Sequence, residues 1–195
     1  MSLVDEIVNI EWNEIKKIIK TEEKEKTFMI MRKSQFELWP EELLYSYLDD
    51  LKRAEQNGWN LITEKYARIL EYTDFVQYQY IEHMIPKVPK ETEDIIDMII
   101  VIQSLWMQQF EKQYPRLAEA AKSIEVYENE ANDVSYEAML KCELMTYSAN
   151  TIMLYANMII SYKKRNVNYI RKMMEITCKY YNYTIIDEAE RNLTN

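Results

Sequence analysis

The chain has 195 residues, enough for one domain that buries about 70% of its unfolded surface. A single glycine and four prolines are too few for a turn-rich β protein, so the composition favours an all-α fold. The net charge of −9 argues against a nucleic-acid-binding protein, because phosphate binding needs a concentrated cationic surface.

Targeting and membrane signals are not visible in the sequence. The longest apolar runs, 95–107 and 152–160, are shorter than the ~20 residues that a membrane helix needs. Residues 1–6 lack the basic start and apolar core of a secretory signal. Cys142 and Cys178 form no metal motif, and we predict buried free thiols, with a disulfide as the less favoured alternative. We therefore expect a cytoplasmic protein that does not bind membranes.

In chain order, the first predicted helix covers residues 3–19, where apolar residues recur with helical spacing. The charge run Thr21–Lys26 is typical of a solvated helix end or a short loop. A short helix follows, and Pro40 can occupy the first turn of the next helix. Gly58 readily takes the left-handed conformation that ends a helix, and Asn60 is suited to cap the helix after it.

The middle of the chain contains the most apolar predicted helix. The sequence predicts a shorter helix over residues 75–84 in front of it, closed by Pro86 and Pro89. Residues 91–113 carry apolar side chains around nearly the whole circumference, which predicts a helix at the centre of the fold. Pro115 ends or kinks this helix, and 124–134 is typical of an acidic exposed loop. Residues 187–193 add a terminal helical turn or two.

Residues 27–73 resemble residues 135–181 at a constant offset of 108 positions, without a gap. Gly58 then matches Asn166 and Asn60 matches Asn168, so both spans carry the same helix stop and cap. We predict an internal duplication of a three-helix unit, and repeats of this kind fix an architecture. The expected fold is a single all-α domain, 1–195, a bundle of about 7–9 helices in which a connector, 74–134, supplies the central apolar helix.

Metal and catalytic signals are weak. His83 is the only histidine, so the paired Glu-x-x-His motifs of a di-iron bundle cannot be built, and no glycine-rich loop exists to hold phosphate. A carboxylate-only Mg²⁺ or Mn²⁺ site stays open, although Glu11 and Glu14 have the spacing of a solvated helix face. Its candidate ligands are Glu11, Glu14, Glu64, Glu71 and Glu143. We expect no bound metal and no cofactor, and whether the chain is an enzyme stays open.

Polar and aromatic residues inside the two repeats are the candidate ligand-binding residues: Arg32, Gln35, Trp39, Tyr47, Glu143, Tyr147 and Tyr155. Gln35 and Glu143 match by position, so at a twofold axis both would need partners or a ligand. Arg32 matches the apolar Leu140, so the positive charge would come from the first copy only. The second copy would supply the opposite charge, on Glu143. We predict that Arg32 and Glu143 lie within reach of each other or of one cavity. A buried hydrogen-bonded network without a ligand is the alternative.

These residues favour a binding module for a small molecule or a protein partner at the interface of the two repeats. One alternative is a carboxylate-based enzyme, with or without a divalent metal. The other is a protein–protein interaction or dimerisation protein, in which twelve methionines and sixteen tyrosines supply an adaptable surface, and a homo-oligomer is then expected.

Several motifs resemble the bacterial and archaeal domain-of-unknown-function family 4125. They are Glu11-Trp12, Phe28-x-x-Met31-Arg32-x-Ser34-Gln35-Phe36-x-x-Trp39, Gly58-x-Asn60-Leu61-x-x-Glu64-Lys65-Tyr66-Ala67 and Glu143-Leu144-x-Thr146-Tyr147-Ser148. The likeness covers most of the chain, and the sequence departs from the family pattern at Pro40 and Cys142, where a serine and a glycine are usual. Because the family carries no assigned reaction, the resemblance implies a shared fold and leaves the function open.

Overall fold

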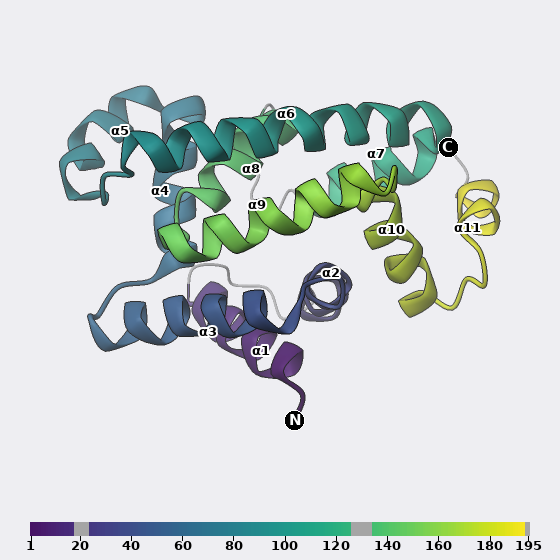
Figure 1. Cartoon of the computed structure of the whole chain (residues 1–195), viewed down its shortest axis with the longest axis horizontal. Coiled ribbons are helices and arrows are strands. Elements are labelled where there is room, and N and C mark those ends of the chain that lie inside the picture. Colours follow the sequence, from purple (N-terminus) through teal and green to yellow (C-terminus); the bar gives the residue numbers. More distant parts are fainter. Residues whose placement is uncertain (18–23, 126–133, 194–195) are drawn as a thin grey trace.

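The computed structural model of the protein describes residues 1–17, 24–125 and 134–193. Within these ranges the chain forms eleven α-helices and no strand, which confirms the all-α prediction (Figure 1). The helices are α1 (Leu3–Ile15), α2 (Glu25–Phe36), α3 (Glu41–Gln56), α4 (Leu61–Thr73), α5 (Phe75–Ile81), α6 (Lys90–Gln113), α7 (Pro115–Glu125), α8 (Tyr136–Leu144), α9 (Ala149–Lys164), α10 (Tyr169–Tyr180) and α11 (Ile186–Asn192). A 3₁₀ turn, η2 (Glu82–Met84), follows α5.

The number of helices exceeds the predicted range. Pro115 ends α6 as expected, but a separate helix, α7, begins at the same proline, whose fixed backbone angle suits the first helical position. The first half of the charge run Thr21–Lys26 lies outside the described residues, and its second half forms the start of α2. Most of the acidic segment 124–134 also lies outside the described residues, so that prediction stays untested. In the described part of the chain, no helix is long and apolar enough to cross a membrane.

The helix stops and caps predicted at two matching places are confirmed. Gly58 and Asn166 both have positive φ angles, of 66° and 53°, directly after α3 and α9. The side chain of Asn60 accepts a hydrogen bond from the backbone N–H of Thr63 at the start of α4. Asn168 caps α10 in the same way, three residues before its donor. The helices α3 and α9 also begin and end 108 positions apart, whereas the duplication of the whole unit stays a prediction.

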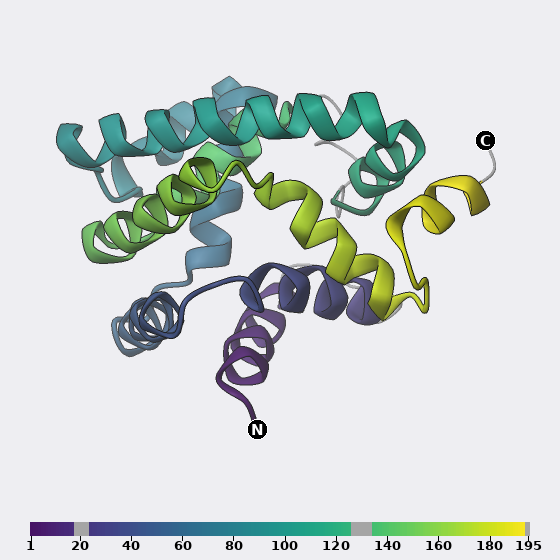
Figure 2. The same ribbon diagram turned by 45° about the vertical axis from the view of Figure 1, so that its right-hand side comes forward.

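The first half of the chain, α1 to α4, and the second half, α5 to α11, pack against each other through helices of both. Helix α4 packs against α8, and α10 packs against α2, so each half contributes a helix to the other. Helices α3 and α9 meet between them. Helix α1 covers α2, α3 and α4, while α6 covers α8, α9 and α10 on the opposite side of the molecule (Figures 1 and 2). Helices α1 and α6 therefore occupy comparable positions, one in each half.

The prediction that the apolar helix 91–113 lies at the centre is wrong. In α6, Ile96 and Ile99 are fully buried, but Met98, Val101 and Leu105 are exposed, Val101 with 62% of its surface accessible. These three residues recur at helical spacing and form one apolar stripe on the outer face. Only the face that meets α8, α9 and α10 is covered, so α6 is an outer helix.

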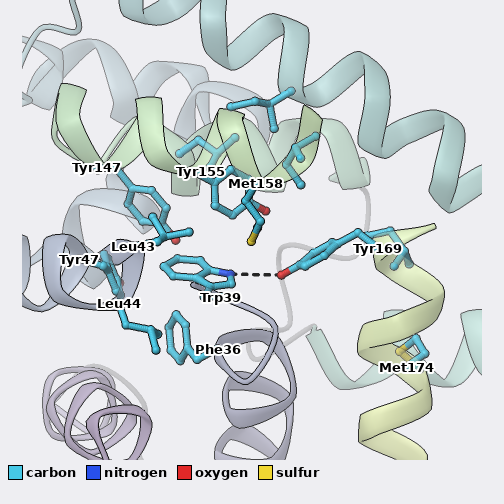
Figure 3. Close-up of a cluster of buried hydrophobic side chains, with 14 of the residues drawn as sticks. Phe36, Trp39, Leu43, Leu44, Tyr47, Tyr147, Tyr155, Met158, Tyr169 and Met174 are labelled. Carbon is cyan, nitrogen blue, oxygen red and sulfur yellow. Dashed lines mark hydrogen bonds between the residues drawn. The ribbon is translucent and has the colours of Figure 1, made fainter. Parts of the chain in front are cut away.

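Aromatic side chains from both halves form the middle of the core (Figure 3). The ring of Trp39 lies 5.4 Å from Tyr155, 5.7 Å from Tyr47 and 6.2 Å from Tyr147, measured between centroids, each in an edge-to-face arrangement. Edge-to-face pairs are favoured by the aromatic quadrupole and each adds about 0.5–1.5 kcal/mol beyond burial. This aromatic layer holds α3 against α9 and forms the floor of the site described next.

Candidate functional site

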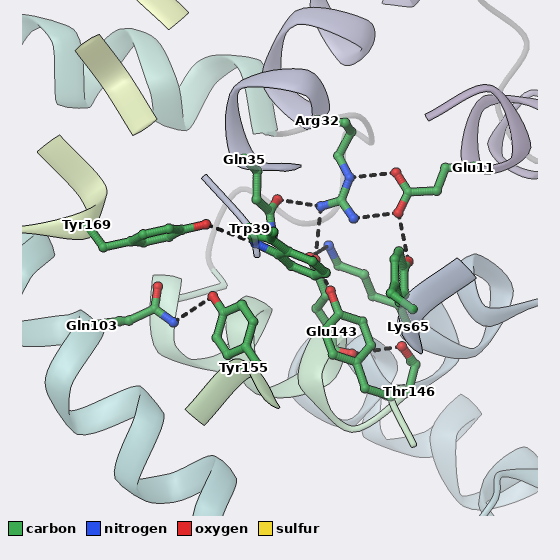
Figure 4. A network of polar contacts seen from close by, with 12 residues as sticks. Glu11, Arg32, Gln35, Trp39, Lys65, Gln103, Glu143, Thr146, Tyr155 and Tyr169 are labelled. Carbon is green, nitrogen blue, oxygen red and sulfur yellow. Dashed lines mark hydrogen bonds and ion pairs between the residues drawn. The ribbon is translucent and has the colours of Figure 1, made fainter. Parts of the chain in front are cut away.

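Arg32 is at the centre of a network of ion pairs (Figure 4). Its Nε and Nη2 donate to the two carboxylate oxygens of Glu11, at 2.7 and 2.5 Å. Its Nη1 donates to Oε1 of Gln35 at 2.8 Å and to Oε1 of Glu143 at 2.9 Å. The predicted approach of Arg32 to Glu143 is therefore confirmed. The two-point contact with Glu11 fixes the plane of the guanidinium, which makes the geometry specific.

Three helices bring this network together. Arg32 and Gln35 are three residues apart on α2, a spacing that places two side chains on one face of a helix. Glu11 comes from α1, and Glu143 comes from the last turn of α8. The contact between Arg32 and Glu143 joins residues 111 positions apart, so it ties the two halves of the chain directly.

The carboxylate of Glu143 accepts three hydrogen bonds. Its Oε1 receives the hydroxyl of Tyr147 at 2.8 Å in addition to Arg32, and its Oε2 receives Nζ of Lys65 at 2.7 Å. Burial raises the pKa of Glu143, but the positive charges of Arg32 and Lys65 outweigh burial and hold that pKa well below its usual range. Burial likewise lowers the pKa of Lys65, and the charge of Glu143 more than offsets it. Both groups stay ionised at neutral pH.

Glu11 is completely buried, which contradicts its interpretation as part of a solvated helix face. Besides Arg32, its Oε1 accepts the hydroxyl of Tyr47 at 2.7 Å. Burial and the negative charge of Glu11 raise the pKa of Tyr47, so this hydroxyl stays protonated. The signal in the sequence was the position of Glu11, four residues from both Ile7 and Ile15 on the buried face of α1.

Uncharged residues form the other end of the site, on the opposite side in the view of Figure 4. Nε2 of Gln103 donates to the hydroxyl of Tyr155 at 2.9 Å, and Oε1 of Gln103 accepts from Tyr136 at 3.2 Å. The indole N–H of Trp39 donates to the hydroxyl of Tyr169 at 3.2 Å. Burial raises the pKa of Tyr155 and Tyr169 well above the usual value, so both remain neutral. The Gln103–Tyr155 pair of the second half corresponds to the Glu11–Tyr47 pair of the first.

A cavity of about 150 Å³ lies between the two halves, next to the ion pairs. Sixteen of its twenty lining residues form eight pairs that are 108 positions apart. Such pairs include Phe28 with Tyr136, Met31 with Met139, Tyr47 with Tyr155 and Ile62 with Ile170. Each half therefore supplies lining residues at matched sequence positions, whereas the duplication itself stays a prediction.

Two of these pairs combine a charged with an apolar residue. Arg32 is matched by Leu140, and Lys65 is matched by Met173. Both cations come from the first half, whereas Glu143, which contacts both, comes from the second half. The cavity therefore has a charged end and an uncharged end in spite of its matched scaffold.

All seven candidate residues predicted from the sequence lie in this region. Five of them line the cavity: Arg32, Gln35, Tyr47, Glu143 and Tyr155. Trp39 and Tyr147 lie behind its wall in the aromatic core. Glu11 was considered only as a metal ligand, and the residues that the sequence interpretation missed are Lys65, Gln103 and Tyr169. Among these, Gln103 and Tyr169 carry no signal that separates them from ordinary helix residues.

Among the carboxylates considered for a metal site, Glu11 and Glu143 both contact Arg32, whose charge takes the place of a metal ion, and the others lie elsewhere. Glu64 pairs with Arg68 and accepts from the indole of Trp59, and Glu14 pairs with Lys17. The described residues contain no group of three or more acidic, histidine or cysteine side chains that could hold a metal ion. The geometry thus gives no support to a carboxylate-bound metal in these parts of the chain.

Nucleophilic chemistry has no assembled machinery in the described structure. His83 is exposed on η2. Cys142 and Cys178 are free and buried, as predicted, and burial raises the pKa of each thiol to about 11. Because the thiolate is the reactive form, neither cysteine is set up as a nucleophile at neutral pH.

Comparison with known proteins identifies one family. The model of a family described as "Protein of unknown function (DUF4125)" matches residues 1–191, which confirms the resemblance seen in the motifs. No curated protein and no solved structure matches the chain. Every residue of the ion-pair network and of the cavity lies inside the matched range.

Proposed function

Because the chain belongs to the DUF4125 family of proteins of unknown function, we propose a function from the site itself: the protein is a binding module that holds a small molecule in the cavity between its two halves. The observation that carries this proposal is the cavity, which is walled by apolar side chains at one end and by fixed ion pairs at the other.

The charged side chains at the cavity wall are already held by partners within the protein. Arg32 is held by Glu11, Gln35 and Glu143, and Glu143 is held in turn by Lys65 and Tyr147. A site whose side chains are already fixed does not lose their conformational entropy on binding. Binding sites for small molecules are usually concave, largely apolar and preformed in this way.

The size of the cavity limits the ligand. An apolar protein cavity of about 150 Å³ accommodates a molecule the size of benzene. The apolar part of the lining, with Met139, Leu140, Ile170 and Met173, suits a hydrocarbon body of that size. We therefore expect a ligand with an apolar body of about six heavy atoms.

Hydrogen-bond donors at the cavity wall define the polar part of the ligand. The ammonium of Lys65 has three N–H donors, and among the described residues it makes one hydrogen bond, to Glu143. The hydroxyl of Tyr155 accepts from Gln103 and keeps its own O–H for another acceptor. An oxygen atom that accepts hydrogen bonds would satisfy these donors.

Binding is favoured over catalysis by the ionisation states of the site. General acid–base catalysis needs a group whose pKa lies near the working pH. Here Glu143 is shifted downward, and Arg32, Lys65, Tyr47 and Tyr155 are shifted upward. These groups therefore hold their protons, or their charges, across the neutral range.

A calorimetric titration with benzyl alcohol tests the proposal. Met173→Trp fills the cavity with a larger side chain, and we expect it to abolish heat of binding that the natural chain shows. Met153→Trp is the matched control, because Met153 is 48% exposed on α9 and lies outside the cavity. Equal affinity in both variants would place the bound molecule elsewhere and contradict the proposal.

One observation favours a second candidate, a protein-interaction role. The exposed apolar stripe of Met98, Val101 and Leu105 on α6 is the kind of surface that a partner covers. Sedimentation equilibrium of the natural chain and of Val101→Glu tests self-association. A dimer that the substitution converts to a monomer supports this role, and a monomer in both cases rejects a homo-oligomer through this face.

The two free, buried thiols support a reducing compartment, and we therefore place this binding module in the cytoplasm.

A further inference from the structure

We infer that the molecule held in this cavity carries no net charge, an inference that rests on the proposed binding function. Among the described residues, three charged side chains line the cavity, Arg32, Lys65 and Glu143, and the fully buried Glu11 pairs with Arg32 directly behind them. Two are negative and two are positive, so the site is neutral as a whole. Each charge is also matched locally, because Arg32 bridges the two carboxylates and Lys65 binds the second of them.

A charged ligand would disturb this balance. An anion that approached Lys65 would also approach Glu143, whose Oε2 lies 2.7 Å from Nζ of Lys65. A cation that approached Glu143 would meet both Lys65 and Arg32. In either case one charge in a largely buried site would remain without an opposite charge, which is strongly unfavourable.

An uncharged oxygen acceptor meets no such penalty. The spare N–H groups of Lys65 and the O–H of Tyr155 can donate to it without any change in the ion pairs. The opposite half of the cavity replaces charge by Leu140 and Met173 and suits an apolar body. The ligand class is therefore a benzene-sized alcohol, aldehyde, ketone or amide.

Three probes of nearly equal size test the inference near neutral pH: benzyl alcohol, benzoate and benzylammonium. For the natural chain we expect benzyl alcohol to bind at least about tenfold more tightly than either ion, corresponding to about 1.4 kcal/mol. Calorimetric titration measures all three dissociation constants under one buffer and salt concentration.

Single substitutions should then switch the charge preference. Lys65→Met leaves the site with one excess negative charge, and we expect benzylammonium to bind several-fold more tightly than benzoate. Glu143→Gln leaves one excess positive charge, and we expect the opposite order. A merely structural effect would weaken all three probes together and would not reverse the order of the two ions.

Two further variants keep the experiment decisive. Gln35→Glu adds a negative charge beside Arg32 without removing a partner of Arg32. If Lys65→Met fails to fold, Gln35→Glu therefore tests in its place whether an excess negative charge makes benzylammonium bind more tightly than benzoate. Lys52→Met is the control, because Lys52 forms an exposed ion pair with Glu6 outside the cavity, and it should leave the preference for benzyl alcohol unchanged.

The outcomes separate the two proposals. If none of the three probes binds, the proposed binding function fails. If benzoate or benzylammonium binds the natural chain most tightly, the binding function stands and the inference of an uncharged ligand is overturned. It is also overturned if the substitutions leave the order of the two ions unchanged.

Discussion

At the scale of single residues, Arg32 is the side chain that connects the charged residues of the site. It compensates Glu11 and Glu143, which come from different halves of the chain, and its guanidinium also covers the ring of Phe36 at 4.7 Å from the centroid. A buried carboxylate without a partner is costly, so Glu11 depends on Arg32 for its counter-charge, while Glu143 shares Arg32 and Lys65. The residue that positions the site is therefore also a residue that holds the fold together.

Replacement of Arg32 should destabilise the protein strongly. Arg32→Met leaves Glu11 without its buried counter-charge, and we expect the free energy of unfolding to fall by about 3–5 kcal/mol. Arg53→Met is the control, because Arg53 is exposed on α3 and should change that free energy by less than about 0.5 kcal/mol. Urea unfolding curves of both variants provide the comparison, and similar midpoints for the two would contradict the role of Arg32.

Glu143 should make stability fall in acid. Its pKa in the folded chain lies below the ordinary value of 4.5, because Arg32 and Lys65 outweigh the effect of burial. The unfolded chain therefore binds this proton at a higher pH than the folded chain does. The contribution of Glu143 to the free energy of unfolding is present above about pH 4.5, the ordinary pKa, and is lost as the pH falls below that value. We expect a steeper acid loss of unfolding free energy in the natural chain than in Glu143→Gln, measured by urea titration at several pH values, and equal slopes would contradict this.

The residues of the site differ in how well the sequence predicts them. Arg32 and Glu143 were identified because the repeat register places a cation opposite a leucine and an acid opposite an amide. Lys65 stood in a quoted motif, but a lysine on a helix is normally solvated, and only its contact with Glu143 shows its role. Gln103 could not be predicted, because it lies outside both repeated spans and the register therefore gives it no counterpart, and its partner Tyr155 is 52 positions away on another helix.

At the scale of helices, Asn60 and Asn168 are matching N-cap residues that stabilise the first turns of α4 and α10. Asn60→Ala and Asn168→Ala each remove a side-chain acceptor from the first turn of a helix, α4 or α10. We expect each to lower the free energy of unfolding by about 1 kcal/mol. Chemical denaturation measures both changes. An unchanged value for either variant would mean that water or another group satisfies the exposed N–H groups equally well.

Helix α6 shows what periodicity cannot predict. Its apolar residues surround the helix, and that pattern predicted a central position. The structure covers only one face and leaves Val101 and Leu105 exposed. Hydrophobic pattern reports which side chains are able to be buried, whereas the neighbours that bury them depend on how the whole chain is arranged.

At the scale of the whole molecule, neither half is complete alone. Helices α2 and α4 lose their partners α10 and α8 when the chain is divided between α4 and α5. We expect a fragment of residues 1–74 to show little helical circular dichroism, because its apolar faces stay exposed. Mixing it with residues 75–195 should restore helicity and an unfolding transition. A fragment that folds fully by itself would show that the halves are independent domains.

The contacts between the two halves also have a consequence for biosynthesis. Arg32 is synthesised 111 residues before its partner Glu143, and Trp39 is synthesised 130 residues before its partner Tyr169. At typical translation rates of about 5–20 residues per second, these intervals last roughly 5–25 s. During this time the aromatic face of the nascent first half has no covering surface of its own chain. The cavity is therefore among the last features to form, and a translation product that ends before α8 lacks all the lining residues from Tyr136 to Met173.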